Sequence, residues 1–226
     1  MRTPEWTGQL WLGRDYGLIQ GELGRTAPHA HYAHQLILAP AAPVTVSLDG
    51  QPCTAQHVFI PAMQRHAILD APGTLFTLYA EPLTIDAQAL QHSLLGVELT
   101  LPALAEALRH CPRRTLQDRR IEKALAALDR QLAGKVSASA LAAHAHLSLS
   151  QLERLFSGQL GLPVRRLVLW RRLRLAMGLV LAGQAITEAA HGAGFADSAH
   201  FSRTLKTLFG VTARQALQHI DLRLLD

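Results

Sequence analysis

The sequence predicts an α+β protein with an N-terminal β-barrel and an all-α C-terminal domain that contains two helix-turn-helix motifs joined by a linker helix. Short runs of apolar residues, divided by Gly, Pro and Asp, predict strands between residues 10 and 80. A pattern of capped helix, tight turn and capped helix occurs twice in the second half, about fifty residues apart. The two halves also differ in charge.

Residues 1–112 contain five Lys and Arg against nine Asp and Glu, a net charge of −4, whereas residues 113–226 contain seventeen against eight, a net charge of +9. A basic half attached to a mildly acidic half is typical of a DNA-binding domain with a separate sensing domain. A solvated, Arg-rich surface is the alternative interpretation of this charge.

The composition favours a soluble chain of one large or two modest domains. The first residues, MRTPEWTGQLWLG, contain Glu5 and no continuous apolar core, so we expect no signal peptide, and no membrane segment is visible. Cys53 and Cys111 are far apart and lack metal-ligand spacing, which favours a reducing cytoplasm without disulfides.

The expected strands of the N-terminal region are short and closely spaced, as in a small sandwich or barrel. Leu48-Asp49-Gly50-Gln51 predicts a hairpin turn of the Asp-Gly kind. The strand runs are WLGRDYGLIQGEL, HQLILAP, PVTVSLDG, CTAQHVFIP and GTLFTLYAE.

A leucine-rich helical segment follows, and Pro102 is expected to divide it into two helices. Its apolar stripe suits either a dimer contact or packing on the barrel, and the sequence does not separate the two. The polar, basic run from Cys111 to Arg120 is the best linker candidate. We therefore expect a sensor barrel at 1–82, a dimerisation or packing segment at 83–112 and a DNA-binding domain at 113–226.

The second helix-turn-helix is expected at about residues 186–210. Gly194 ends its first helix, and Asp197 or Ser198 caps the next. The apolar stripe of that next helix faces a core, and its polar, cationic face has the chemistry to enter a DNA major groove. The apolar residues are Phe201, Leu205 and Leu208, and the polar ones are Ser198, Ser202, Arg203 and Lys206. An ordinary αα-hairpin with a solvated face is the alternative.

The first copy is expected at about residues 137–161, with Ser148 or Ser150 as the cap and Leu152, Leu155 and Phe156 as the buried stripe. A long helix at about residues 163–182, starting near Pro163, joins the two copies.

These motifs resemble the AraC family of bacterial transcription regulators over residues 116–219. The resemblance is carried by Ser148 through Phe156 with Gly161, by Arg172 and Ala176, and by Gly194, Phe195, Ser198, Phe201, Ser202, Arg203, Phe209 and Gly210. Ala189 and Ala213 depart from the family pattern, which has a larger aliphatic residue and Pro at these positions.

The resemblance implies an operator-binding regulator, a homodimer, controlled by a small-molecule effector. Its base-reading positions correspond to Ser150, Gln151, Glu153 and Arg154 in the first motif, and to Ser198, Ala199, Ser202 and Arg203 in the second. An Arg can bind guanine and a Gln adenine through paired hydrogen bonds. Arg172 matches an arginine that braces the motifs, and the other arginines of the joining helix predict a steep fall of DNA affinity with salt.

The N-terminal region is similar to a cupin-type sensor barrel. Its resemblance places the effector near His29, His31, Gln35 and His66, with no catalytic residue assigned. In cupins the three histidines correspond to metal ligands, so a divalent metal is one possibility, and a metal-free pocket is the other. A metal-dependent enzyme or a metal sensor is the alternative to an effector-controlled regulator.

Overall fold

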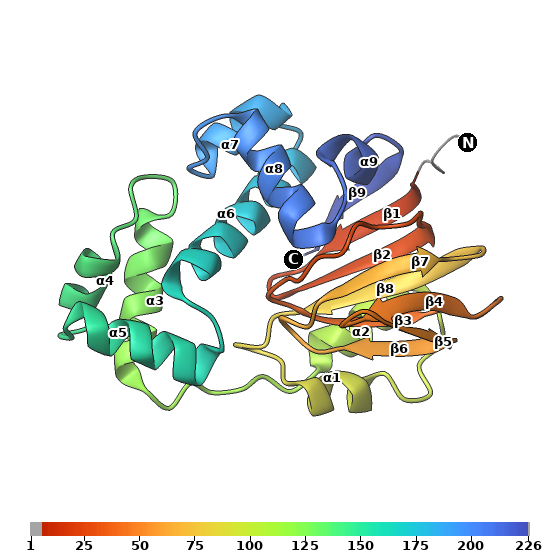
Figure 1. Cartoon of the computed structure of the whole chain (residues 1–226), viewed down its shortest axis with the longest axis horizontal. Helices are drawn as coiled ribbons and strands as arrows, with labels where there is room; N and C mark the ends of the chain where they lie inside the picture. The colour runs from red at the N-terminus through yellow and green to blue at the C-terminus, as the bar shows by residue number, and fades with distance from the viewer. Residues whose placement is uncertain (1–5, 226) are drawn as a thin grey trace. The chain divides into compact units, whose positions relative to one another are not determined.

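A computed structural model of the chain describes residues 6–225 (Figure 1). By their internal contacts, these residues form two compact units, one made of residues up to Arg114 together with those from Leu205 onward, and the other of Thr115–Thr204. The break after Arg114 lies inside the segment that the sequence indicates as a linker. The C-terminal residues, which the sequence analysis assigns to the DNA-binding domain, pack with the N-terminal unit.

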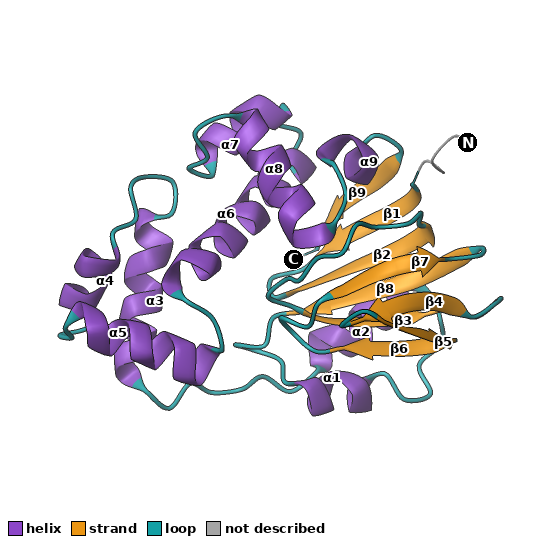
Figure 2. Cartoon of the chain, viewed as in Figure 1, coloured by secondary structure: helices purple, strands orange, loops and turns teal. Residues whose placement is uncertain are grey.

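The first unit contains nine strands in two sheets (Figure 2). The larger sheet has the order β6-β3-β8-β2-β1-β9, antiparallel throughout except for the parallel pair β1 and β9, and the smaller has the order β5-β4-β7. The strands are β1 (Thr7–Leu12), β2 (Tyr16–Glu22), β3 (His34–Leu38), β4 (Val44–Leu48), β5 (Gln51–Ala55), β6 (His57–Ile60), β7 (His66–Asp70), β8 (Thr74–Ala80) and β9 (Ile220–Leu224).

Two apolar cores hold this unit together. Ile37 of the large sheet and Val46 and Ile68 of the small sheet belong to one cluster, so the sheets pack face to face. Leu78 of the large sheet packs with Leu104 in a second cluster, which includes α1 (Ala87–Ser93) and α2 (Leu101–His110). Both faces of the large sheet are therefore buried, which accounts for its nearly continuous apolar strands.

The predicted β-rich fold is present, but the described residues do not form a closed barrel. Gln56 separates β5 from β6, and these two strands belong to different sheets, so the expected single strand from Cys53 to Pro61 is wrong. The alternation of inward residues shifts by one position there, from Cys53 and Ala55 to Val58 and Ile60. The Asp-Gly hairpin is confirmed, with positive φ at Asp49 (49°) and Gly50 (89°).

The C-terminal half is helical as predicted up to Leu217, and one further strand, β9, follows and joins the large sheet beside β1. Its sequence IDLRL alternates apolar and polar residues with the period of a strand. The leucine-rich segment forms two helices with Pro102 in the first turn of α2, and the buried face of α2 packs on the sheet.

The second unit is helical. Its elements are α3 (Arg119–Gln131), α4 (Ala138–His144), α5 (Leu149–Leu155), a π-helical turn η1 (Phe156–Leu160), α6 (Val164–Leu181), α7 (Ile186–Gly192) and the first half of α8 (Ser198–Phe209). The second half of α8 belongs to the first unit and is followed there by α9 (Ala213–Leu217). Within residues 6–225, no helix has the length and apolar character needed to cross a membrane.

Candidate functional site

The first helix-turn-helix consists of α4 and α5. Ser148, rather than Ser150, caps α5, because its Oγ accepts the N–H of Gln151 at 3.3 Å while Gln151 Oε1 accepts the N–H of Ser148 at 2.9 Å. Leu152 and Phe156 are fully buried, as the sequence predicts. The polar side of α5 is therefore fixed toward solvent.

The second helix-turn-helix consists of α7 and α8. Asp197, rather than Ser198, supplies the cap, since its Oδ1 accepts the N–H of His200. Gly194 follows α7 with φ of 81°, and the N–H of Phe195 donates a hydrogen bond to the carbonyl of Ala190. In the first motif His146 occupies the corresponding left-handed position with φ of 56°, so both turns share one backbone geometry.

The predicted base-reading residues lie on the outer sides of α5 and α8. Ser150, Gln151, Glu153 and Arg154 are exposed on α5; on α8, Ala199, Arg203 and Lys206 are exposed and Ser198 and Ser202 are half-buried. The side chain of Gln151 is engaged in the capping box, so contact with a base requires it to leave Ser148. Direct contact of these residues with DNA stays a prediction.

The arginines of the joining helix α6 lie in two different environments. Arg172 donates from Nε to the carbonyl of Leu132 at 3.1 Å and from Nη2 to that of Gly134, and a Cβ at Gly194 would lie 2.9 Å from Arg172 Nε. Arg172 thus binds the segment after α3 and lies close to the turn of the second motif, and its predicted bracing of both motifs stays a prediction. By contrast, Arg165 and Arg166 are exposed.

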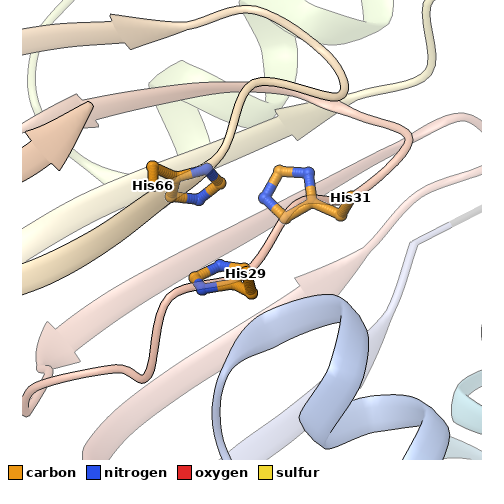
Figure 3. Close-up of side chains that lie close together, drawn as sticks. All are labelled: His29, His31 and His66. Atoms are coloured by element: carbon orange, nitrogen blue, oxygen red, sulfur yellow. The ribbon is translucent and has the colours of Figure 1, made fainter. Parts of the chain in front are cut away.

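Three buried histidines meet in the first unit, as Figure 3 shows. His29 and His66 exchange backbone hydrogen bonds of 2.9 and 2.8 Å, so their side chains lie directly opposite each other. The N–H of Met63 donates to the carbonyl of His31 at 2.9 Å. Met63 adopts φ of 67°, a left-handed backbone conformation that glycine adopts more readily. One ring nitrogen from each histidine lies within 4.8 Å of the other two.

The backbone fixes the orientation of all three rings. Nδ1 of His29 lies 2.8 Å from the carbonyl of Ala27, Nδ1 of His31 lies 3.1 Å from that of Ala33, and Nδ1 of His66 lies 2.9 Å from that of Gln64. Because a carbonyl only accepts, Nδ1 of His29 and of His66 carries the proton, and each of these neutral rings keeps a lone pair on Nε2. Nε2 of His66 is buried and has no hydrogen-bond partner among residues 6–225.

Burial keeps these rings neutral. Desolvation, aided by the neighbouring His66, lowers the pKa of His29 to about 4, and desolvation with both neighbouring histidines lowers the pKa of His31 to about 3. Desolvation also lowers the pKa of His66. The neutral imidazole is the form in which histidine binds a metal ion.

Gln35 and Tyr79 adjoin the cluster. Gln35 is 1% exposed, its Oε1 lies 3.1 Å from Nε2 of His31, and its Nε2 donates to the hydroxyl oxygen of Tyr79 at 3.4 Å. Burial raises the pKa of Tyr79, so its hydroxyl stays protonated. The structure thus brings together all four residues that the sequence resemblance assigns to the effector site.

The end of helix α8 forms a further part of this cluster, which the sequence analysis missed. The ring of Phe209 stacks on His31 with centroids 5.1 Å apart and lies 5.5 Å from the ring of Tyr79. Gly210 accepts the N–H of Ala27 at 3.0 Å, and a Cβ on Gly210 would lie 2.7 Å from His29 Nδ1. Phe209 and Gly210 belong to the residues that carry the family resemblance, but no local pattern in the sequence links them to His29 and His31.

Comparison with known proteins identifies a helix-turn-helix domain at residues 141–219. The chain is 35% identical over 106 residues, 46% of its length, to the uncharacterized HTH-type transcriptional regulator YidL of Escherichia coli K12, and the match spans only 36% of that relative.

Solved structures with a similar fold include ToxT from Vibrio cholerae, with a TM-score of 0.57 and 11% identity over 91% of this chain and 99% of ToxT. Another is wild-type ToxT bound to an unsaturated fatty acid, with a TM-score of 0.55 and 10% identity over 96% of each chain. At these identities the likeness concerns the fold.

Proposed function

Because the chain carries a helix-turn-helix domain of the AraC type over residues 141–219, we propose that the protein is a sequence-specific DNA-binding transcriptional regulator. Its partner is a double-stranded operator, and it acts in the cytoplasm as a homodimer. The exposed faces of α5 and α8 read base edges, while exposed arginines of α6 bind phosphates.

The arrangement of two capped reading helices on one joining helix supports this proposal most directly. The 18 residues of α6 span about 27 Å at 1.5 Å per residue. Successive major grooves on one face of B-DNA lie about 34 Å apart. A helix of this length, braced by Arg172, suits two reading heads that enter consecutive grooves.

The N-terminal unit supplies control in this account. A small-molecule effector binds at the histidine cluster, with His29, His31, Gln35 and His66 as its contacts. ToxT, which shares the fold, has been solved with an unsaturated fatty acid bound, and that ligand supports effector control in this architecture. An enzymatic role for the cluster leaves the DNA-reading half without a purpose, so we expect no catalysis.

Selection from a pool of random duplexes, followed by sequencing of the retained DNA, tests the proposal. The intact protein should enrich a site with two short specified blocks about one helical turn apart. An Arg154→Ala, Arg203→Ala double variant should lose that preference, because each paired contact of an arginine with guanine contributes about 1–3 kcal/mol of discrimination.

An Arg119→Ala, Arg130→Ala double variant removes the same charge from exposed positions of α3 and should retain the preference. If the intact protein enriches no sequence, the proposed function fails. If both double variants lose the preference equally, the effect is one of net charge, and the assignment of the reading residues is wrong.

A further inference from the structure

We propose that the histidine cluster binds a divalent transition-metal ion through Nε2 of His29, His31 and His66, and that Phe209 and Gly210 link its occupancy to helix α8. The proposal deepens the effector site of the proposed function, since it names the ligand class and the element that responds. The binding of the ion itself does not depend on DNA.

The donor set fits such an ion. Nε2 of His66 is a buried acceptor without a partner in residues 6–225, and a buried polar atom left unpaired in this way costs about 1–3 kcal/mol. Nδ1 of each ring lies at hydrogen-bond distance from a backbone carbonyl oxygen, which is the arrangement that commonly orients metal-bound histidines. The cluster therefore has the lone pairs, the supporting hydrogen bonds and an atom that needs a partner.

The spacing of the nitrogens is compatible with one ion. One ring nitrogen of each histidine lies within 4.8 Å of the other two, whereas nitrogens bound at about 2.1 Å to a tetrahedral ion lie about 3.4 Å apart. The three nitrogens therefore need to approach one another by at most about 1.5 Å to bind one ion. Imidazole donors favour Zn²⁺, Co²⁺, Ni²⁺ or Cu²⁺ over Mg²⁺ and Ca²⁺.

The contact of Gln35 with His31 is explained by a cation or by a turned amide. Both ring nitrogens of His31 face an oxygen: Nδ1 lies 3.1 Å from the carbonyl of Ala33, and Nε2 lies 3.1 Å from Oε1 of Gln35. A neutral ring carries one proton, so one of these contacts joins two acceptors. Two acceptors at this distance repel unless a cation shares them or the amide turns over. A metal ion beside His31 binds both Nε2 of His31 and Oε1 of Gln35 without turning the amide over.

The link to α8 follows from the way that helix ends. The carbonyl oxygen of Gly210 accepts the N–H of Ala27, two residues before His29. Residue 210 has φ of 70°, and a side chain there would collide with Ala27 and His29. Phe209 stacks on His31, so a shift of that ring on metal binding acts on the last turn of α8. The predicted reading residues begin at Ser198, on the same continuous helix, about 16 Å away at 1.5 Å per residue.

Titration of the full-length apoprotein with Co²⁺ tests the metal site. We expect one equivalent to bind, with a visible absorption band typical of the bound ion, and millimolar Mg²⁺ should not compete. His66→Ala should weaken binding at least tenfold, whereas His57→Ala, at an exposed histidine of β6, should not. A rise in melting temperature of the unmodified protein with Co²⁺, reversed by a chelator, makes the result independent of how His66→Ala folds. Absence of stoichiometric Co²⁺ binding by the unmodified protein overturns the proposal.

Hydrogen exchange over residues 204–211, measured with and without Co²⁺, tests the link without DNA. Metal should slow exchange there in the unmodified protein, and Phe209→Leu, which removes the ring stacked on His31, should diminish this effect while one equivalent of Co²⁺ still binds. Unchanged exchange in the unmodified protein refutes the link.

On a duplex obtained by selection, Co²⁺ should shift the affinity of the unmodified protein by about 5- to 150-fold, the range of typical allosteric coupling, and the shift should be smaller in Phe209→Leu. An unshifted affinity, with metal bound and DNA recognised, also refutes the link. If no duplex is bound with or without metal, the proposed function fails, and the Co²⁺ and exchange results still decide the metal site and its link to α8.

Discussion

Replacement of Gly210 by Ala measures how firmly the end of α8 is fixed to the histidine cluster. Gly161 is the matched control, because it ends the corresponding helix of the first motif with nearly the same φ, 68° against 70°. Apart from its own chain neighbours, no atom of residues 6–225 lies within 4 Å of a Cβ at Gly161. At Gly210 a Cβ would meet the carbonyl oxygen of Ala27 and lie 2.7 Å from Nδ1 of His29.

The expected magnitudes follow from these contacts. A left-handed conformation costs an L-residue about 1–2 kcal/mol, and the smaller chain entropy of Ala in the unfolded state returns about 0.5–1 kcal/mol. Gly161→Ala should therefore reduce the free energy of unfolding by about 1 kcal/mol. Gly210→Ala adds an overpacking cost of about 1–3 kcal/mol, for a total loss of about 2–4 kcal/mol.

Urea denaturation followed by circular dichroism, with each transition fitted separately, gives these free energies. The Gly210→Ala loss should appear in the transition of the unit that contains the sheets, because that unit includes residues 205–225. Equal losses for the two variants would show that Gly210 does not pack against His29, and the structural basis of the link would be lost.

Four further results are expected. Burial lowers the pKa of His29 and His31 from 6.5 to about 4 and 3, so as pH falls the unfolded state binds protons before the folded state does. Each of these rings should therefore lower the free energy of unfolding by about 2 kcal/mol at pH 5 relative to pH 8. The urea midpoint should fall between these two pH values. His146→Gly should raise the free energy of unfolding by about 0.5–1 kcal/mol, since glycine relieves the positive φ of 56°; an unchanged or lower value in urea denaturation contradicts this. Gln35→Glu should tighten Co²⁺ binding at least tenfold in the same titration as above, because a carboxylate replaces a neutral oxygen near Nε2 of His31, and weaker binding would place the metal elsewhere. DNA affinity should fall steeply with salt, by about 10³- to 10⁵-fold between 50 and 200 mM if six to ten phosphates are contacted, and a flat response in anisotropy titrations argues against DNA binding.

The helices and turns of the second half could be predicted from the sequence because they depend on residues close to one another in the chain. The joining helix expected at residues 163–182 is observed at Val164–Leu181, and the turns at Gly194 and Asp49-Gly50 form where glycine permits a left-handed backbone. These features depend on neighbours within a few residues. The choice between Ser148 and Ser150, or between Asp197 and Ser198, depends on the final hydrogen bond and was left open by the sequence.

Long-range packing explains the rest. The sequence placed three histidines in one pocket only through a resemblance, and the backbone pairing of His29 with His66 provides the physical reason. The contact of Phe209 with His31 and the pairing of β9 with β1 join the two ends of the chain. No local pattern specifies such a partner, although the alternation in IDLRL indicates a strand.

The central claim is that one chain reads two adjacent major grooves through helices held by α6. Its most direct test measures the affinity of the intact protein for a selected duplex and for the same duplex with five base pairs inserted between its two blocks. Half a helical turn places the blocks on opposite faces, so the inserted duplex should bind no more tightly than a duplex with one block scrambled. Equal affinity for the original and the inserted duplex would contradict the two-headed reader.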